Sequence, residues 1–553
     1  MTALERLAEA DAVTRLRERD ASLFALDIDQ RIPIGHRLGW TDLASKAPAR
    51  LPLLDGLAEA LRAEGATDVI LLGMGGSSLA PYVMSAVIGS ASGFPRLHVL
   101  DTTSPVGVSE TLDELDPQTT FVLISSKSGT TIEPLSLYAV VRAWLEASGM
   151  SHPEAGRRCI VITDPGSALE KLRQRDVMRL ALAAPVTVGG RYSALSMFGL
   201  APAALIGIHL PSLIARAQAM EHACAYPLEV NPGALLGAWI ADAWEAGQDK
   251  LTIVCSDALR PLGLWIEQLV AESLGKDGTG VVPVIEYAPS SPPGYADDRA
   301  VVVLRFKDDA PLAAWSHDVA ASHPVFELTA TDVFDIGAEF VRWEYAIALA
   351  GFLLGVNPFD ELAVTEAKEA TATILDGDAE QVPHAIADFD GTWVTYAGAL
   401  DPPLSMPTSR TGALRDAVRS LGPEDHLAVL AYIADDESRV VPLRDACSVI
   451  ARATGRAAGL QLGPRYLHST GQLHKAGPDN GVFVLVTARD RTDVKVPGRP
   501  FTLGQLHRAQ AEGDLVTLAR HGRRIVRLDL PDSDPATLAA LAGDLTIAAS
   551  AGI

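Results

Sequence analysis

The chain has 553 residues, of which 48% are apolar and 21% are charged, a composition typical of globular rather than disordered proteins. Its 69 acidic and 46 basic residues give a formal net charge of −23. Because nucleic acids and anionic membranes attract basic surfaces, neither is expected to be the main partner.

The N-terminal residues, Met-Thr-Ala-Leu-Glu-Arg, lack the basic start and the apolar segment of a signal peptide. The longest apolar stretch, 346–356, is too short to span a bilayer and is predicted to be a buried helix. Four cysteines without CxxC spacing (Cys159, Cys224, Cys255 and Cys447) are expected to be reduced thiols rather than disulfides or metal ligands. These features predict a soluble, cytoplasmic protein.

Helical and apolar segments alternate along most of the chain. Residues 1–60 are predicted to be helical, and short apolar strands are predicted at 69–72, 97–100, 121–124 and 159–163. A second set of strands is predicted at 251–255, 281–285 and 301–306. A third follows at 427–433, 459–462, 481–487 and 525–530, with helices at 410–421 and 443–454. Helices between short apolar strands are typical of parallel sheets covered on both faces.

The predicted fold class is therefore α/β. We expect an N-terminal helical segment (1–50) and two doubly wound parallel-sheet subdomains (51–210 and 211–375). A third, C-terminal α/β domain (376–553) would follow. This division agrees with the three or four domains or subdomains that a chain of this length predicts at about 100–200 residues each.

The loop at 126–131, Ser-Lys-Ser-Gly-Thr-Thr, follows the predicted strand 121–124 at a turn into a helix. Free backbone N–H groups and the positive end of a helix dipole meet at such a turn and suit a phosphate. The hydroxyls would add hydrogen-bond donors, and Lys127 would neutralise part of the charge. A Ser/Thr-rich helix cap without a ligand is the alternative, and on the loop alone the two interpretations are equally open.

A second turn, 73–78 (Gly-Met-Gly-Gly-Ser-Ser), follows the predicted strand 69–72. Glycines there would let the backbone approach a ligand closely. A dinucleotide-binding turn, with Asp101 on the ribose, is one alternative, although the spacing departs from GxGxxG; a purely structural turn is another. Since both turns lie at the carboxyl ends of parallel strands, they are expected on one edge of the sheet, and together they indicate a sugar phosphate.

This turn and loop resemble the sugar-isomerase (SIS) domain signature of the glucose-6-phosphate isomerase family. Three further segments match motifs of that family in the same order: 188–193, 271–276, and 357–360 followed by 364–368. The C-terminal domain resembles that of the isomerase half of bacterial transaldolase/glucose-6-phosphate isomerase fusions, although no transaldolase half is present in this sequence. The resemblance implies two SIS subdomains and reversible isomerisation of glucose 6-phosphate and fructose 6-phosphate in glycolysis and gluconeogenesis.

Moving a carbonyl between C1 and C2 requires a base that shuttles one proton through a cis-enediol(ate), and fixed positive charge where the oxyanion develops. The resemblance assigns the base to Glu272 and the positive charge to Arg191. The ordinary alternatives are an exposed helix glutamate and a surface salt bridge at a turn. The resemblance implies no organic cofactor and no metal.

The histidine that opens the sugar ring in the family has no matching segment between Glu272 and Lys368. The nearest similar segment is 466–475, in the predicted third domain, which makes His468 the candidate and His474 the reserve. Lys368 would contact the ring oxygen or assist opening. The alternatives are structural histidines and a solvated helix lysine.

The resemblance also assigns the substrate contacts. The phosphate would be held by Ser77, Ser126, Lys127, Ser128, Thr130 and Thr131, and the rest of the substrate would contact Gly75, Gly76 and Gly190. A small sugar phosphate is thus the expected ligand, and the family implies a homodimer with shared active sites and a relation to transaldolase.

Other functions remain open at this point. One is an SIS isomerase of another sugar phosphate, such as a mannose or amino-sugar phosphate. A non-catalytic sugar-phosphate-binding regulator is a second, although it would have no use for both Glu272 and Arg191. A nicotinamide enzyme is the third and the least favoured.

Overall fold

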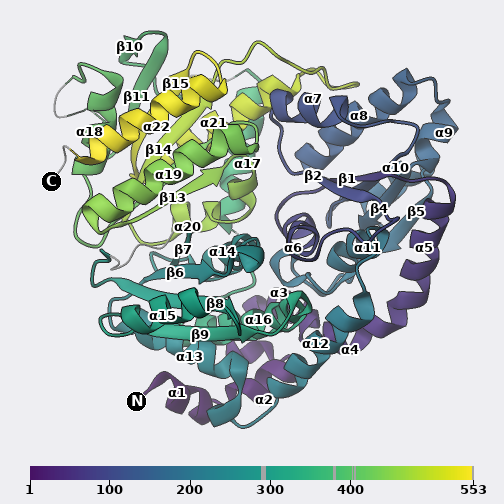
Figure 1. Ribbon diagram of the computed structural model, residues 1–553, viewed down its shortest axis with the longest axis horizontal. Coiled ribbons are helices and arrows are strands. Elements are labelled where there is room, and N and C mark those ends of the chain that lie inside the picture. Colours follow the sequence, from purple (N-terminus) through teal and green to yellow (C-terminus); the bar gives the residue numbers. More distant parts are fainter. Residues whose placement is uncertain are drawn as a thin grey trace.

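Three β-sheets follow one another along the chain (Figure 1). The structure is a computed structural model and is described for residues 1–25, 27–287, 294–360, 362–377, 382–401, 403 and 406–550. In Figure 1 the first sheet lies on the right, the second at the lower left and the third at the upper left. The three sheets come in the order of the three predicted α/β units, whose boundaries stay predictions.

The first sheet is parallel throughout, in the order β2-β1-β3-β4-β5. The strands are β1 (Asp68–Leu72), β2 (Arg96–Leu100), β3 (Thr120–Ser125), β4 (Cys159–Thr163) and β5 (Leu180–Ala183). The four predicted strands are confirmed. Strand β5 was not predicted: this edge strand, Leu-Ala-Leu-Ala, is short and only partly buried, and two of its four residues are alanines, which have little preference for strands.

Helices cover both faces of the first sheet. They are α5 (Leu51–Ala63), α6 (Leu79–Ile88), α7 (Pro105–Asp113), α8 (Ile132–Ala147), α9 (His152–Arg157), α10 (Ala168–Arg175) and α11 (Met197–Leu205). In β1, Val69 and Leu71 pack into the core shared with α5, α6 and α11, whereas Ile70 and Leu72 pack against α7 and α8. This burial on both faces explains the uninterrupted apolar strands.

The second sheet is also parallel, in the order β7-β6-β8-β9. Its strands are β6 (Lys250–Cys255), β7 (Val282–Glu286), β8 (Arg299–Phe306) and β9 (Val325–Ala330); edge strand β9 was not predicted. The surrounding helices are α12 (Leu210–Ala223), α13 (Pro232–Glu245), α14 (Leu262–Leu274), α15 (Ala310–Val319), α16 (Ile336–Leu354) and α17 (Leu362–Leu375). Helix α16 contains most of the apolar stretch 346–356 and is buried along most of its length, which confirms the predicted core helix.

The N-terminal residues form α1 (Ala3–Glu9), α2 (Ala12–Arg17), α3 (Ile28–Gly35) and α4 (Leu43–Lys46), all short helices as predicted. Their apolar side chains join one core with residues of the first and second sheets. Within the described residues, no helix combines the length and apolarity needed to cross a membrane. The four cysteines are buried and free, as predicted.

The third sheet is mixed, in the order β10-β11-β15-β14-β12-β13. The four predicted strands are present as β12 (His426–Ala431), β13 (Ala457–Leu462), β14 (Gly481–Ala488) and β15 (Arg524–Leu530), and they are parallel to one another. An unpredicted hairpin, β10 (Ala387–Phe389) and β11 (Thr392–Gly398), adds to the edge in antiparallel direction. The helices are α18 (Arg410–Arg419), α19 (Glu437–Thr454), α20 (Gly471–Ala476), α21 (Leu503–Arg520) and α22 (Pro535–Ser550).

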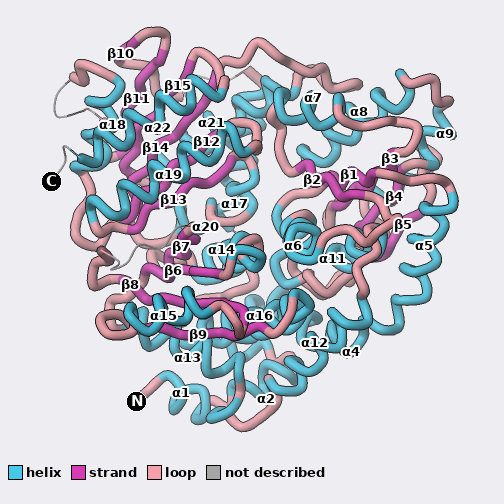
Figure 2. The backbone as a smooth tube through the Cα atoms, viewed as in Figure 1, coloured by secondary structure: helices cyan, strands magenta, loops and turns pink. Residues whose placement is uncertain are grey.

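The third domain packs against helices of both other α/β units (Figure 2). Helix α21 packs along α17, and α20 packs against α14. Val496, in the segment before α21, and Leu503, the first residue of α21, belong to the same apolar core as Leu169 and the strands of the first sheet. Residues of the third domain therefore pack against both of the first two α/β units.

Candidate active site

A cavity of about 320 Å³ lies where the three domains meet. All the predicted site residues except Thr130 line it, and they come from each of the three predicted α/β units. Thr130 lies exposed beside the cavity, where its hydroxyl is 3.0 Å from that of Ser128. Met74, Ser125, Pro134, Asp164, Gln268 and Arg37 complete the lining; none of them was predicted.

The 126–131 loop joins β3 to α8 at the cavity. Thr131 is the N-cap residue of α8, but its side chain makes no capping bond to the helix. Its hydroxyl instead accepts a hydrogen bond from Ser126 Oγ at 3.2 Å, and Ser126 Oγ accepts from the amide of Gly129 at 3.2 Å. Gly129 adopts a left-handed conformation, with φ of 69°, which turns the chain between the hydroxyls. The structure therefore does not support the simple helix-cap alternative.

Lys127 forms an ion pair that the sequence did not predict. Its ammonium lies 2.9 and 2.7 Å from the two carboxylate oxygens of Asp164, at the turn after β4. It also donates to the carbonyl of Pro185 at 3.3 Å. Both Lys127 and Asp164 line the cavity, so the carboxylate offsets part of the positive charge of the loop.

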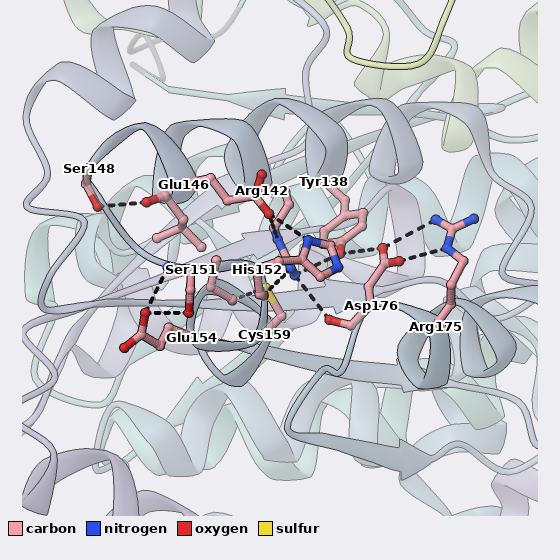
Figure 3. Close-up of polar contacts among 12 residues, drawn as sticks. Tyr138, Arg142, Glu146, Ser148, Ser151, His152, Glu154, Cys159, Arg175 and Asp176 are labelled. Atoms are coloured by element: carbon pink, nitrogen blue, oxygen red, sulfur yellow. Dashed lines mark hydrogen bonds and ion pairs between the residues drawn. The ribbon is translucent and has the colours of Figure 1, made fainter.

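Helix α8, which starts at this loop, is fixed further along by a polar network around the buried side chains of Tyr138, Arg142 and Asp176 (Figure 3). Arg142 donates to Glu146 Oε1 at 2.8 Å and to the carbonyl of Asp176 at 3.3 Å. The hydroxyl of Tyr138 donates to Asp176 Oδ2 at 2.8 Å, and Arg175 donates to Asp176 Oδ1 at 2.7 Å. This network anchors α8 against α10 and so stabilises the position of the helix start.

The glycine turn at 73–78 packs directly on the turn before Arg191. A Cβ atom on Gly76 would lie 2.1 Å from the carbonyl of Gly190, so only glycine allows this approach. Gly75 has a φ of 54° and lies against the backbone of His468. The turn therefore packs against both the turn of Arg191 and the segment of His468.

Asp101, the ribose acid of the dinucleotide alternative, is 2% exposed. Both of its carboxylate oxygens accept hydrogen bonds from Arg465 of the third domain, each at 2.8 Å. Because this carboxylate is already engaged within the protein, the structure gives the dinucleotide alternative no support.

Glu272 and Arg191 form a buried ion pair at the cavity. Arg191 Nη1 lies 2.8 Å from Glu272 Oε1, and Gln268 Nε2 donates to Glu272 Oε2 at 3.0 Å. The two residues are only 8% and 3% exposed. Neither the exposed helix glutamate nor the surface salt bridge describes them. Gln268 lies one helical turn before Glu272 on α14, and this spacing could have identified it from the sequence.

The guanidinium of Arg191 is held by several acceptors. Its Nε donates to Ser273 Oγ at 2.9 Å, and its Nη2 donates to the carbonyls of Pro358 and Asp360, each at 2.8 Å. Lys276 binds the same segment through the Asp360 carbonyl at 2.7 Å. Burial and the nearby Arg191 cation lower the pKa of Lys276 to about 8. The motifs at 188–193, 271–276 and 357–360 are thus physically connected.

His468 lies in the cavity of its own chain, although it belongs to the third domain. Its Nε2 is 2.9 Å from Glu133 Oε1, at the first turn of α8. Burial raises the pKa of Glu133, but the charge and hydrogen bond of His468 outweigh this effect and hold that pKa below its usual value. The reserve candidate, His474, is instead a core residue: it is 3% exposed and its ring lies 5.0 Å from that of Phe483.

Lys368, on α17, is exposed and lines the mouth of the cavity. Its neighbour Glu366 points to His521 at 2.8 Å. Among the described residues, no group of three or more histidine, cysteine, aspartate or glutamate side chains is arranged to hold a metal ion.

Comparison with known proteins agrees with this geometry. The family model described as Phosphoglucose isomerase matches residues 58–289. The glucose-6-phosphate isomerase of Rubrobacter xylanophilus is 31% identical over 370 residues, which cover 57% of this chain and 84% of that protein.

Two solved structures share the fold. A hypothetical protein of Thermus thermophilus has a TM-score of 0.59 and 26% identity, covering 68% of this chain and 97% of that one. A glucose-6-phosphate isomerase of Chlamydia trachomatis has a TM-score of 0.53 and 18% identity, covering 68% and 86%, which supports the fold alone. By its sequence, its fold and the residues gathered in the cavity, this chain belongs to the phosphoglucose isomerase family.

Proposed function

We propose that this protein is a glucose-6-phosphate isomerase that interconverts glucose 6-phosphate and fructose 6-phosphate. One observation carries the proposal: the buried Glu272–Arg191 pair shares a cavity with a hydroxyl-rich helix start. A base and a fixed cation thus lie within reach of a substrate anchored by its phosphate.

The phosphate would bind to the start of α8. The hydroxyls of Ser77, Ser126, Ser128 and Thr131 line the cavity there, beside the amides of the loop. Anchoring this non-reacting end supplies binding energy and orients C1 and C2 toward Glu272.

Ring opening is assigned to His468. Since its Nε2 faces the carboxylate of Glu133, Nδ1 is the nitrogen left to exchange a proton with the sugar. The imidazolium would give a proton to the ring oxygen as the C1–O5 bond breaks, and the imidazole would take the proton that the C1 hydroxyl loses, which gives the open-chain aldehyde and returns the histidine to its starting state. Lys368, at the mouth of the cavity, would assist by stabilising charge on the ring oxygen.

Glu272 would then take the proton from C2 of the aldehyde. The electrons of the C2–H bond form the C1–C2 double bond, and negative charge develops on O1 of the cis-enediolate. Arg191 stabilises that charge and cannot lose its own proton. After a proton moves from O2 to O1, Glu272 returns its proton to C1, which leaves the ketone at C2 of fructose 6-phosphate.

The test is turnover of fructose 6-phosphate by the wild type and by Glu272→Gln. General base catalysis contributes about 10²- to 10⁴-fold, so kcat of the variant should fall by that order while KM stays similar. Mannose 6-phosphate and glucosamine 6-phosphate, assayed alongside, address the other substrate classes. A wild type that binds fructose 6-phosphate without turnover would be a sensor, and a fully active Glu272→Gln variant would refute the assigned base.

Three further expectations on partners and location stay predictions from the resemblance: a homodimer, a relation to transaldolase, and a cytoplasmic location. One structural fact bears on the homodimer. Glu272, Arg191, Lys368 and His468 line a cavity of a single chain, so the site does not need a second copy to supply any of them.

A further inference from the structure

Helix α21 of the third domain contacts three parts of the site. Gln510 donates to the carboxylate of Glu133 at 2.7 Å. Asp514, one turn later, accepts from the hydroxyl of Tyr466 at 2.6 Å, two residues before His468. Gly513 packs on the helix of Lys368 so closely that a Cβ atom would lie 2.9 Å from the amide of Thr371. Helix α21 therefore contacts Glu133, the segment that carries His468, and helix α17, which carries Lys368.

We propose that Gln510 is a positioning residue for ring opening, which fixes the carboxylate of Glu133 so that this carboxylate orients His468. The proposal rests on the proposed function, because it concerns the histidine assigned to ring opening there.

Two hydrogen bonds in series connect buried groups: Thr103 donates to Gln510, and Gln510 donates to Glu133. Glu133 Oε1 accepts from Gln510 Nε2 at 2.7 Å and faces His468 Nε2 at 2.9 Å. Gln510 Oε1 accepts from the hydroxyl of Thr103 at 2.6 Å, which directs the amide nitrogen toward Glu133. Gln510 and Thr103 are 2% and 0% exposed. Water therefore does not easily replace either bond.

The chain of contacts also crosses the domain boundary. Thr103 and Glu133 belong to the first α/β unit, whereas Gln510 and His468 belong to the third. His468 reaches the sugar only if the two units keep this relative position. Gln510 joins them at Glu133, beside the contact of His468 itself and in addition to that of Arg465 with Asp101. A displacement of about 1 Å at a reacting group costs on the order of 100-fold in rate.

The test compares Gln510→Met with wild type and with Gln505→Met. Methionine has the volume of glutamine but makes neither hydrogen bond. Gln505 is exposed on the same helix, five residues earlier, where its Oε1 accepts from the amide of Thr502 at 2.9 Å in the N-terminal capping box. Gln505→Met therefore makes the same chemical change and also removes a hydrogen bond from α21, but away from Glu133. We expect kcat of Gln510→Met to fall about 10- to 100-fold with KM within about twofold, and Gln505→Met to stay within about twofold of wild type.

Gln510→Glu supplies a readout that a merely structural role would not change. The introduced carboxyl would face Glu133 and His468, with Tyr466, Tyr432, His507 and Asp514 close by and the charge of Lys368 acting on Glu133. Near neutral pH two carboxylates would repel, whereas at lower pH one shared proton would restore a donor to Glu133. The activity of Gln510→Glu relative to wild type should therefore rise as pH falls, whereas the relative activity of Gln510→Met should not.

Each outcome decides the proposal. A folded Gln510→Met variant with wild-type kcat would overturn it, as would equal, pH-independent losses in Gln510→Met and Gln510→Glu. If near-ultraviolet circular dichroism shows that Gln510→Met does not fold, Thr103→Val decides instead: we expect kcat to fall about fivefold, and an unchanged kcat would overturn the role. A wild type without isomerase activity would refute the proposed function, whereas an active wild type with unaffected variants refutes only the positioning role.

Discussion

Replacing Gly76 with alanine tests whether the approach of two turns sets the catalytic geometry. The added Cβ atom would lie 2.1 Å from the carbonyl carbon and oxygen of Gly190 and 2.8 Å from the amide of Arg191. Ordinary contact begins at 3.4 Å, so the turns must separate by about 1.3 Å. Because one turn carries Ser77 and the other leads to Arg191, this separation moves the proposed phosphate anchor away from the proposed oxyanion site.

Overpacking of this kind costs about 1–3 kcal/mol of unfolding free energy, and a shift of about 1 Å at the reacting groups costs on the order of 100-fold in kcat/KM. Urea unfolding and fructose 6-phosphate kinetics measure the two effects. Gly189→Ala is the matched control, because its Cβ atom would meet nothing within 4 Å and its φ of −69° suits alanine. Gly76→Ala with wild-type kinetics, or Gly189→Ala with the same loss, would refute the reasoning.

Two further predictions concern pH and subunit composition. Burial raises the pKa of Glu267 to about 8 from an ordinary 4.5, so the folded state binds the carboxyl proton more tightly than the unfolded state does. The protonated carboxyl therefore contributes stability at low pH, and this contribution is lost as pH rises from about 4.5 to about 8. Gln461 at 3.4 Å is its neighbour in the third domain. Between pH 5 and 8 the free energy of unfolding of the wild type, measured in urea, should fall by up to about 1.4 kcal/mol per pH unit more steeply than that of Glu267→Gln. Parallel curves of unfolding free energy against pH for wild type and variant would contradict this. Since Glu272, Arg191, Lys368 and His468 line the cavity of one chain, mixing the Glu272→Gln and His468→Ala proteins should give no more than the sum of their separate activities, and turnover above that sum would show that subunits share sites.

Strands that are buried on both faces could be predicted directly from the sequence. The five residues of β1 and of β4 are all buried, and four of the five in each strand (69–72 and 159–162) form an unbroken apolar run. Edge strands β5 and β9 mix buried and exposed residues: β5 has only the short run Leu-Ala-Leu-Ala, and Glu327 interrupts the apolar residues of β9. The β10–β11 hairpin did carry a signal: Asp390-Gly391 between its strands has positive φ at both residues, the turn that Asp-Gly favours.

The candidate site also contains residues that the sequence predicts and residues that it does not. The 126–131 loop, Arg191 and Glu272 lie in short motifs whose local backbone suits their chemistry, and the structure brings them together in one cavity. Other contacts of the site were not predicted. Lys127 pairs with Asp164, His468 with Glu133, and Gln510 with Glu133, across 37, 335 and 377 residues of sequence. No local pattern encodes such distances.

The sequence alone determined the chemistry that this protein can offer, because residue type and local spacing fix which groups stand at a helix start or on one face of a helix. Only the tertiary structure decided which of those groups meet. His468 enters the cavity of its own chain because α21 packs against α17 and binds Glu133 through Gln510. His474, six residues later, is directed into the core by the same fold. That choice depends on packing between domains, which is a property of the whole chain rather than of any segment.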